Sequence, residues 1–291
     1  MQLSAHSLYF CCLALCLSKV FGTPIWAGEV VVSPSFPYFV SIEVCNLILC
    51  GGSIIHPNFV ITAAHCFDDF RGKSFYKIRS GTLTVGKGGN MHSIQDIERH
   101  PHYDFHSNLN DIALVIVKDT IIFDNFRKPI PFNQVLDISN SGKEATVIGA
   151  GWTEKGPVNR LKRATVLMVD KSECNSTWIN EDGSPIPNSM ICAGVGNDRQ
   201  DTCDNDSGGP LIIDGFLAGI TSFGFHKCGT PGIPSLYTEV AQFHLWIDLR
   251  ITEFTKRKGL VAESNTGSKA DGKVCHYPKV KTRISSKDGH I

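Results

Sequence analysis

Three side chains in widely separated stretches of the sequence could together perform nucleophilic catalysis. Ser207 lies in the stretch 206–210, Asp-Ser-Gly-Gly-Pro, whose glycines permit a tight loop with one hydroxyl and nearby backbone N–H groups presented together. His65 follows an apolar run and two alanines, and Asp111 leads straight into an apolar segment. Each residue alone has a simpler structural explanation: a turn, a half-buried histidine, a strand-capping acid. Together they supply a nucleophile, a general base and an acid that orients the base.

The segments around these residues have the pattern of a β protein. Short apolar runs alternate with Gly, Pro and polar clusters, which favours antiparallel barrels or sandwiches. A helix is expected from Val240 to about Lys256, where apolar residues recur at intervals of three and four. The expected strands are Phe39–Val44, Ser53–Ile55, Phe59–Ile61, Thr82–Val85, Ile112–Val117, Ala145–Ile148, Ala164–Val169, Leu211–Ile213 and Phe216–Thr221.

The N-terminal stretch 1–22 has the pattern of a secretory signal peptide. Its apolar run, Leu8–Leu17, is too short to span a bilayer, and the expected cut lies within 16–22. No later segment is apolar enough to cross a membrane, so we expect a secreted, extracellular protein. Removal of this peptide leaves an even number of cysteines, which in an exported chain favours disulfides over a metal site. They are Cys45, Cys50, Cys66, Cys174, Cys192, Cys203, Cys228 and Cys275.

Charge is distributed unevenly along a chain whose formal net charge is zero. From Lys256 to the end there are nine Lys or Arg against three Asp or Glu, so the rest of the chain is acidic. A nucleic-acid-binding protein would usually have a basic body, and we expect no such partner. The segment 259–291 is basic, polar and poor in large apolar residues, which predicts a disordered extension. The sequence shows no pattern that would bind a metal or cofactor.

The order His65, Asp111, Ser207 and the residues around them resemble the trypsin/chymotrypsin-like serine proteases of the S1 type. The supporting motifs are Thr62–Cys66, Asp111–Leu114, Asp206–Pro210, Cys50–Ser53, Ser222–Gly224 and Pro234–Thr238. The resemblance covers about Ile25 to Lys256, which places the protease domain at 23–258. It implies two six-stranded antiparallel β-barrels followed by a C-terminal helix and a polar tail. It also implies hydrolysis of peptide bonds through an acyl-enzyme.

The resemblance assigns roles to individual residues. Ser207 would attack the scissile carbonyl, His65 would accept its proton, and Asp111 would hold His65 in the required tautomer. The backbone N–H groups of Ser207 and Asn205 would form the oxyanion site. Asp206 would pair with the new N-terminal ammonium after activation of a zymogen.

The same resemblance implies a pocket for the substrate side chain. Asp201 would lie at its floor and select Arg or Lys, while Gly224 would leave its wall open. Ser222 matches the serine that supports the buried aspartate of the triad. Ser235 stands where trypsin more usually has glycine, and its hydroxyl would narrow the pocket for Arg.

The resemblance also sorts six of the cysteines into three disulfides, Cys50–Cys66, Cys174–Cys192 and Cys203–Cys228. Cys45 and Cys275 remain, either paired with each other or, for Cys275, with another chain. Asn175 begins an Asn-Ser-Thr sequon in what is expected to be a polar loop, which makes it the candidate glycosylation site.

Three departures from the family pattern bear on activity. Two starts compete for the activated N-terminus: Ile25, which follows Pro24, and Val20, which follows Lys19. Asn205 replaces the glycine of the oxyanion site, although Asn tolerates positive φ better than most residues. The stretch 149–152, Gly-Ala-Gly-Trp, displaces the tryptophan of the family's Gly-Trp-Gly.

Two functions from different classes therefore remain. The first is a secreted serine endopeptidase that cleaves after Arg or Lys, with protein or peptide substrates and macromolecular protease inhibitors as partners. The alternative is a binding or regulatory protein that keeps the protease fold with weak or no activity.

Overall fold

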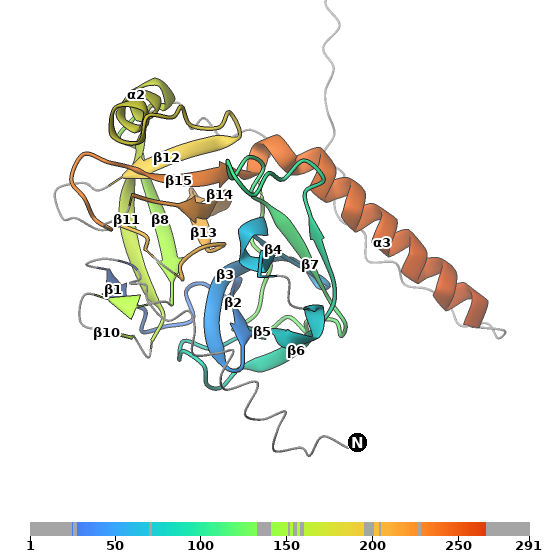
Figure 1. The fold of residues 1–291 in the computed structure, drawn as a ribbon. Helices are drawn as coiled ribbons and strands as arrows, with labels where there is room; N and C mark the ends of the chain where they lie inside the picture. The colour runs from blue at the N-terminus through green and yellow to red at the C-terminus, as the bar shows by residue number, and fades with distance from the viewer. Residues whose placement is uncertain are drawn as a thin grey trace, which may run out of the picture. The chain divides into compact units, whose positions relative to one another are not determined.

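A computed structural model describes most of the chain between Ile25 and Asn265 (Figure 1). The described residues are 25, 28–69, 72–132, 141–150, 152–153, 156–157, 160–194, 201–203, 205–225 and 228–265. The expected signal peptide, Val20 and Cys275 lie outside them.

The first half of the chain closes into a six-stranded antiparallel barrel in the order β2-β3-β4-β7-β6-β5. In Figure 1 its strands run from blue to green. The strands β2 and β7 are buried throughout: β7 consists of five apolar residues, whereas β2 also buries Ser41 and Glu43. The strands are β2 (Phe39–Val44), β3 (Leu47–His56), β4 (Phe59–Thr62), β5 (Tyr76–Ser80), β6 (Asn90–Arg99) and β7 (Ala113–Val117).

The second half forms another antiparallel barrel, in the order β11-β12-β15-β14-β13-β8, which closes where β11 pairs with β8. The short β1 (Glu29–Val30) adds to the edge of β11. The core of the second barrel contains Ile25, which is fully buried among residues of β8, β11 and β13. The strands are β8 (Glu144–Gly149), β11 (Lys162–Val169), β12 (Met190–Gly194), β13 (Pro210–Ile213), β14 (Phe216–Phe223) and β15 (Ser235–Glu239), with a separate pair β9 (Trp152–Thr153) and β10 (Gly156–Pro157).

Helices connect and follow the barrels. The α2 helix (Lys171–Asp182) is preceded by its N-cap, Asp170, whose side chain accepts hydrogen bonds from the backbone N–H groups of Ser172 and Glu173. It is followed by its C-cap, Gly183, where φ is 77°, a conformation that favours glycine. The 3-10 helices are η1 (Ala64–Phe67), η2 (Lys73–Phe75) and η3 (Val240–Phe243), and α3 spans His244–Asn265.

The two barrels and the C-terminal helix agree with the fold class expected from the sequence. The α3 helix extends through Asn265, beyond residue 259, where the disordered extension was expected to begin. The expected strand Thr82–Val85 is wrong, apart from an isolated bridge between Thr84 and Arg160. The hydroxyl of Thr82 instead accepts from the N–H of Thr84 and donates to the carbonyl of Lys87, which favours a turn.

The three disulfides that the family resemblance implies are present. Cys50–Cys66 joins β3 to η1, Cys174–Cys192 joins α2 to β12, and Cys203–Cys228 links two loops of the second barrel. Cys45 is exposed in the turn between β2 and β3.

Within the part of the chain that the structure describes, no helix has the length and hydropathy of a membrane span.

Candidate active site

Asp111 and His65 are in direct contact in the first barrel. Asp111 lies two residues before Ala113, the first residue of β7, and is fully buried. Its Oδ1 accepts the backbone N–H of His65 at 2.9 Å, and its Oδ2 lies 2.7 Å from His65 Nδ1. The hydroxyl of Ser222, on β14 of the second barrel, donates to the same Oδ2 at 2.5 Å. The carboxylate is therefore oriented by groups from both barrels.

The pKa values of this pair are shifted in opposite directions. Burial tends to raise the pKa of Asp111, but the charge of His65 and the hydrogen bonds from His65 and Ser222 hold it below its usual value. Burial tends to lower the pKa of His65, but the charge and hydrogen bond of Asp111, and the charge of Asp68, raise it above its usual value. An ionised Asp111 therefore accepts a hydrogen bond from Nδ1–H of His65, which keeps the proton on Nδ1 and leaves Nε2 as the basic nitrogen.

The loop that carries Ser207 packs against the turn that carries His65. A Cβ atom at Gly208 would lie 2.1 Å from Thr62 Oγ1 and 3.2 Å from the backbone nitrogen of Ala63, so glycine is required for this contact. The carbonyl of Ser207 accepts the N–H of Gly51 on β3 at 2.8 Å. On the other side, the N–H of Gly208 donates to Thr221 on β14 at 2.7 Å. Hydrogen bonds from both barrels thus hold the backbone of Ser207 and Gly208 in place.

The disulfide Cys50–Cys66 lies beside the same turn. His65 and the two sulfur atoms come within 4.8 Å of one another, a grouping that could suggest a metal site. The sulfurs are bonded to each other, and thiolates are the form of cysteine that binds metals. The cluster is therefore structural.

Asp206 and Ile25 meet against Gly149. Asp206 is fully buried, and its Oδ2 accepts the N–H of Cys203 at 3.1 Å. A Cβ atom at Gly149 would lie 1.7 Å from Asp206 Oδ1 and 3.0 Å from Ile25 Cγ1. The carboxyl group next to Ser207 and the side chain of Ile25 therefore share one buried site of the second barrel.

Asp201, Gly224 and Ser235 converge in the second barrel, as expected from the sequence. Asp201 is 4% exposed, and its Oδ1 accepts from the Ser235 hydroxyl and the Thr202 N–H, each at 2.8 Å. Its Oδ2 accepts the N–H of Gly229 at 3.1 Å. A Cβ atom at Gly224 would lie 2.9 Å from Ser235 Oγ. Burial raises the pKa of Asp201 to about 6, although all three hydrogen bonds act to lower it.

Asn205 occupies the left-handed region of backbone space. Its φ is 66°, while Gly208, on the other side of Ser207, has φ 77°. The sequence-based expectation that Asn would tolerate positive φ here agrees with this geometry.

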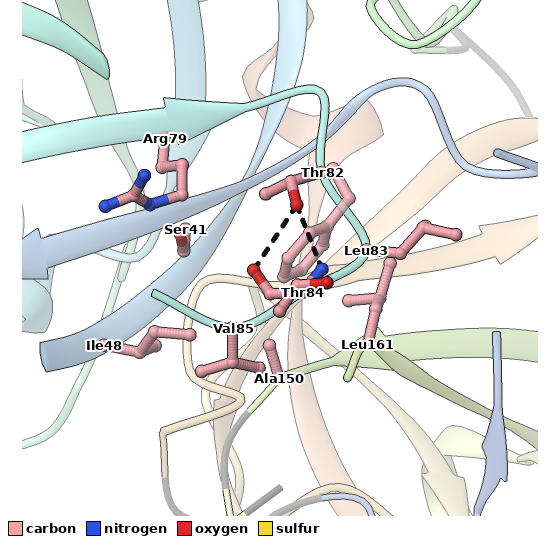
Figure 2. Close-up of a pocket in the computed structure, with 10 residues that line it drawn as sticks. Ser41, Ile48, Arg79, Thr82, Leu83, Thr84, Val85, Ala150 and Leu161 are labelled. Atoms are coloured by element: carbon pink, nitrogen blue, oxygen red, sulfur yellow. Dashed lines mark hydrogen bonds between the residues drawn. The ribbon is translucent and has the colours of Figure 1, made fainter. Parts of the chain in front are cut away.

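Ala150 lines a small pocket to which residues of both barrels contribute (Figure 2). Ala150, which stands at the position of the family's tryptophan, is 6% exposed. In Figure 2 its side chain lies next to Val85, with Leu161 and Leu83 nearby.

Two supporting residues were missed by sequence reasoning. Thr238 donates its hydroxyl to the carbonyl of Asp111 at 2.8 Å, and Thr62 donates to the carbonyl of Gly51 at 2.8 Å. Both lie within motifs that the resemblance quotes, but a hydroxyl inside a strand has no signal of its own in the sequence.

Asn175 is placed differently from the expectation. It lies in the α2 helix rather than in a loop, and its Oδ1 accepts the N–H of Ile186 at 3.0 Å. The polar sequence around it forms a helix because Cys174 and Trp178, on one face, are buried.

Comparisons with known proteins agree with this geometry. The family model described as Trypsin matches residues 25–247. Trypsin epsilon of Drosophila erecta is 36% identical over 73% of this chain and 81% of its own. The vitellin-degrading protease of Bombyx mori is 33% identical over 78% of this chain and 86% of its own. Among solved structures, neuropsin, a serine protease expressed in the limbic system of mouse brain, matches with a TM-score of 0.71 and 27% identity, covering 78% of this chain and all of its own. Because the family model covers most of the chain and relatives of more than 30% identity align with it over most of their length, the chain belongs to the trypsin family of serine proteases.

Proposed function

We propose that this chain is a secreted serine endopeptidase in which Ser207, His65 and Asp111 hydrolyse peptide bonds after Arg or Lys. The observation that carries the proposal is the contact between Asp111 Oδ2 and His65 Nδ1 at 2.7 Å. Ser222 donates a hydrogen bond to the same carboxylate oxygen. The turn that carries His65 packs against the loop that carries Ser207. This arrangement orients a general base and directs its second nitrogen away from the carboxylate.

The chemistry follows from the roles of these atoms. Ser207 Oγ would form a bond to the scissile carbonyl carbon while its proton passes to His65 Nε2. The proton would then pass to the leaving amine as the peptide C–N bond breaks, which leaves an acyl-enzyme on Ser207. A water molecule, deprotonated by His65, would hydrolyse this ester and return Ser207 to its hydroxyl form. Asp111 would stay ionised and stabilise the imidazolium in both steps.

The tetrahedral intermediates need hydrogen-bond donors for their oxyanion. The backbone N–H groups of Asn205 and Ser207 are the candidate donors. The positive φ of Asn205 supports this role, because a residue that keeps the backbone conformation of the family's glycine can keep its N–H in place.

The preference for Arg or Lys would come from Asp201. Its buried carboxylate accepts a hydrogen bond from Ser235, which lies next to Gly224. The positive charge of a substrate Arg or Lys would stabilise the ionised carboxylate, whose burial disfavours its negative charge. The absence of a side chain at Gly224 would leave room for a long substrate residue.

Activation would require a free N-terminus at Ile25. The burial of Ile25 beside Asp206 supports this start over Val20, because an α-ammonium formed here would lie next to the carboxylate. Removal of the signal peptide after residue 22 would leave Thr23 and Pro24, which an extracellular dipeptidyl peptidase could remove. N-terminal sequencing of the secreted protein tests this step: a start at Val20 would contradict it.

Active-site labelling tests the proposed chemistry. A fluorophosphonate probe should label the activated protein at Ser207, and the matched variant Ser207→Ala should take up no label. If the folded, activated protein takes up no label, the alternative of a binding or regulatory protein is favoured, and Asn205 would be the first residue to examine. A peptide library tests specificity: cleavage mainly after Leu or Phe would contradict the role of Asp201.

Other features of the secreted form have their own tests. Labelling that a macromolecular serine-protease inhibitor blocks would identify such inhibitors as partners. Glycosylation at Asn175 should appear as a mass loss on treatment with a peptide N-glycosidase, and Asn175→Gln should remove it.

A further inference from the structure

Asp68, three residues after His65, lies at the end of the turn that carries the imidazole. It caps the η1 helix, and its backbone N–H donates to the carbonyl of His65 at 3.2 Å. Its side chain is 15% exposed. No motif of the family resemblance draws attention to this carboxylate.

Both oxygens of Asp68 are held by donors from another part of the barrel. Arg99, the last residue of β6, donates from Nη1 to Oδ1 at 3.0 Å. Tyr103, in the connection between β6 and β7, donates its hydroxyl to Oδ2 at 2.6 Å. The Arg99 guanidinium also lies 6.0 Å from the centre of the Tyr103 ring. The three side chains form one cluster that joins the η1 turn to the connection leading to Asp111.

This cluster is close enough to the His65–Asp111 pair to act on it electrostatically. Burial lowers the pKa of His65, but the charge and hydrogen bond of Asp111 and then the negative charge of Asp68 raise it above its usual value. Burial, the hydrogen bond to Asp68 and the charges of Asp111 and Asp68 all raise the pKa of Tyr103, so that the phenol stays protonated as a donor. The carboxylates that act on the imidazole are therefore Asp111, which precedes β7, and Asp68, which caps η1. Ser222 from β14 donates to Asp111, and Arg99 and Tyr103 donate to Asp68.

We propose that Asp68 is a second positioning carboxylate for His65, one that holds the η1 turn in place and adds its charge, moderated by Arg99, to that of Asp111. This inference rests on the proposed function in one respect, because the proposed function is what makes His65 a general base whose proton affinity affects catalysis. Asp68 does not touch a substrate. It acts through the position and the proton affinity of the imidazole.

The direction in which each substitution should shift the titration of His65 follows from these charges. Asp68→Asn removes a negative charge near the imidazolium and should move the titration of His65 to lower pH. Arg99→Gln removes the positive charge that moderates Asp68 and should move it to higher pH. Asp69→Asn is the matched control, because it makes the same change in charge one residue away, where the carboxylate bonds Tyr76. It should leave the titration of His65 nearly unchanged.

The direct experiment is an NMR titration of the His65 ring in activated protein that carries Ser207→Ala, which prevents self-digestion. The expected result is opposite shifts for Asp68→Asn and Arg99→Gln and none for Asp69→Asn. The proposal is overturned if Asp68→Asn leaves the midpoint in place, or if Asp69→Asn moves it equally. If Asp68→Asn fails to fold, Tyr103→Phe and Arg99→Gln still test it, because each removes one donor to Asp68 and should shift the midpoint upward.

Kinetics with the serine in place give a second test. For Asp68→Asn, the ratio of kcat/KM at pH 6 to that at pH 8 should rise about twofold or more, as expected for loss of one nearby charge. A purely structural role would lower kcat/KM at both pH values and leave the ratio unchanged, which would contradict the proposal. Absence of all activity would count against the proposed function, whereas the NMR midpoints would still decide the role of Asp68.

Discussion

The hydroxyl of Ser235 donates a 2.8 Å hydrogen bond to Oδ1 of Asp201, the carboxylate proposed to select basic substrates. The backbone N–H groups of Thr202 and Gly229 also donate to this carboxylate. Three donors reduce but do not remove the cost of burying a negative charge, and the pKa of Asp201 remains at about 6. A substrate cation would therefore meet a carboxylate that is part protonated in mildly acidic solution and already engaged by Ser235.

Binding of a small cation should depend on pH through Asp201. The affinity of benzamidine should be constant above pH 7 and fall as the pH drops through about 6, because protonation removes the charge that binds it. Calorimetric titrations between pH 5 and 8 would measure this. The same dependence of benzamidine affinity on pH should be found in His65→Ala, whereas Asp201→Ser should bind benzamidine weakly at every pH. A benzamidine affinity that is independent of pH in the protein with Asp201 in place would contradict the prediction.

Removal of the Ser235 hydroxyl should improve cleavage after basic residues at alkaline pH. Ser235→Ala frees Oδ1 of Asp201 for the substrate, and a hydrogen bond to a charged group corresponds to about tenfold in kcat/KM. At pH 6 the gain should shrink, because loss of this donor raises the pKa of Asp201 further. Matched peptides that end in Arg, Lys or Leu at the cleavage site would test this, and an equal gain for the Leu peptide would argue against it.

The effect of replacing Asn205 should depend on the backbone rather than on its amide. Asn205→Gly should change kcat by less than tenfold, because asparagine already adopts φ 66°. Asn205→Val should lower kcat by about 10²–10³, the loss expected when one oxyanion donor is removed, because a β-branched residue resists this conformation. Single-turnover acylation rates would measure both. A gain of a hundredfold or more in Asn205→Gly would instead mean that the side chain obstructs the substrate.

Breaking the buried ion pair of the first barrel should be costly. Arg79 donates to both oxygens of Glu43, whose side chain is fully buried, and Ser41 donates to the same carboxylate. Arg79→Met leaves a buried negative charge and should lower the free energy of unfolding by about 3–5 kcal/mol.

Urea unfolding with the disulfides intact would measure this change. Arg163→Met is the matched control, because the pair Arg163–Glu29 is largely exposed and such a pair contributes about 0–1 kcal/mol. Equal losses in the two variants would show that burial of the Glu43 charge does not determine the cost.

Much of the fold could be predicted because its strands carry strong local signals. The apolar runs of β2, β4, β7, β8, β11, β13 and β14 lie where the sequence places them. The strands β5, β6, β12 and β15 were missed, as were the two-residue strands β1, β9 and β10. The sequence of β6, Asn-Met-His-Ser-Ile-Gln-Asp-Ile-Glu-Arg, is largely polar, and its pairing with β5 and β7 stabilises it. The α2 helix was missed for a related reason, since it buries only Cys174 and Trp178 among its residues.

By itself, the sequence determined the side chains available for chemistry and the family to which the chain belongs. The types, order and immediate neighbours of His65, Asp111 and Ser207 are local properties, and so is the signal of each strongly apolar strand. Only the tertiary structure decided how groups far apart in the chain act on one another. It placed Ile25 beside Asp206, and it formed the hydrogen bonds from Ser235 to Asp201 and from Arg99 and Tyr103 to Asp68. These relationships depend on burial and on distances of a few ångströms across the barrels, and both arise only when the strands pair.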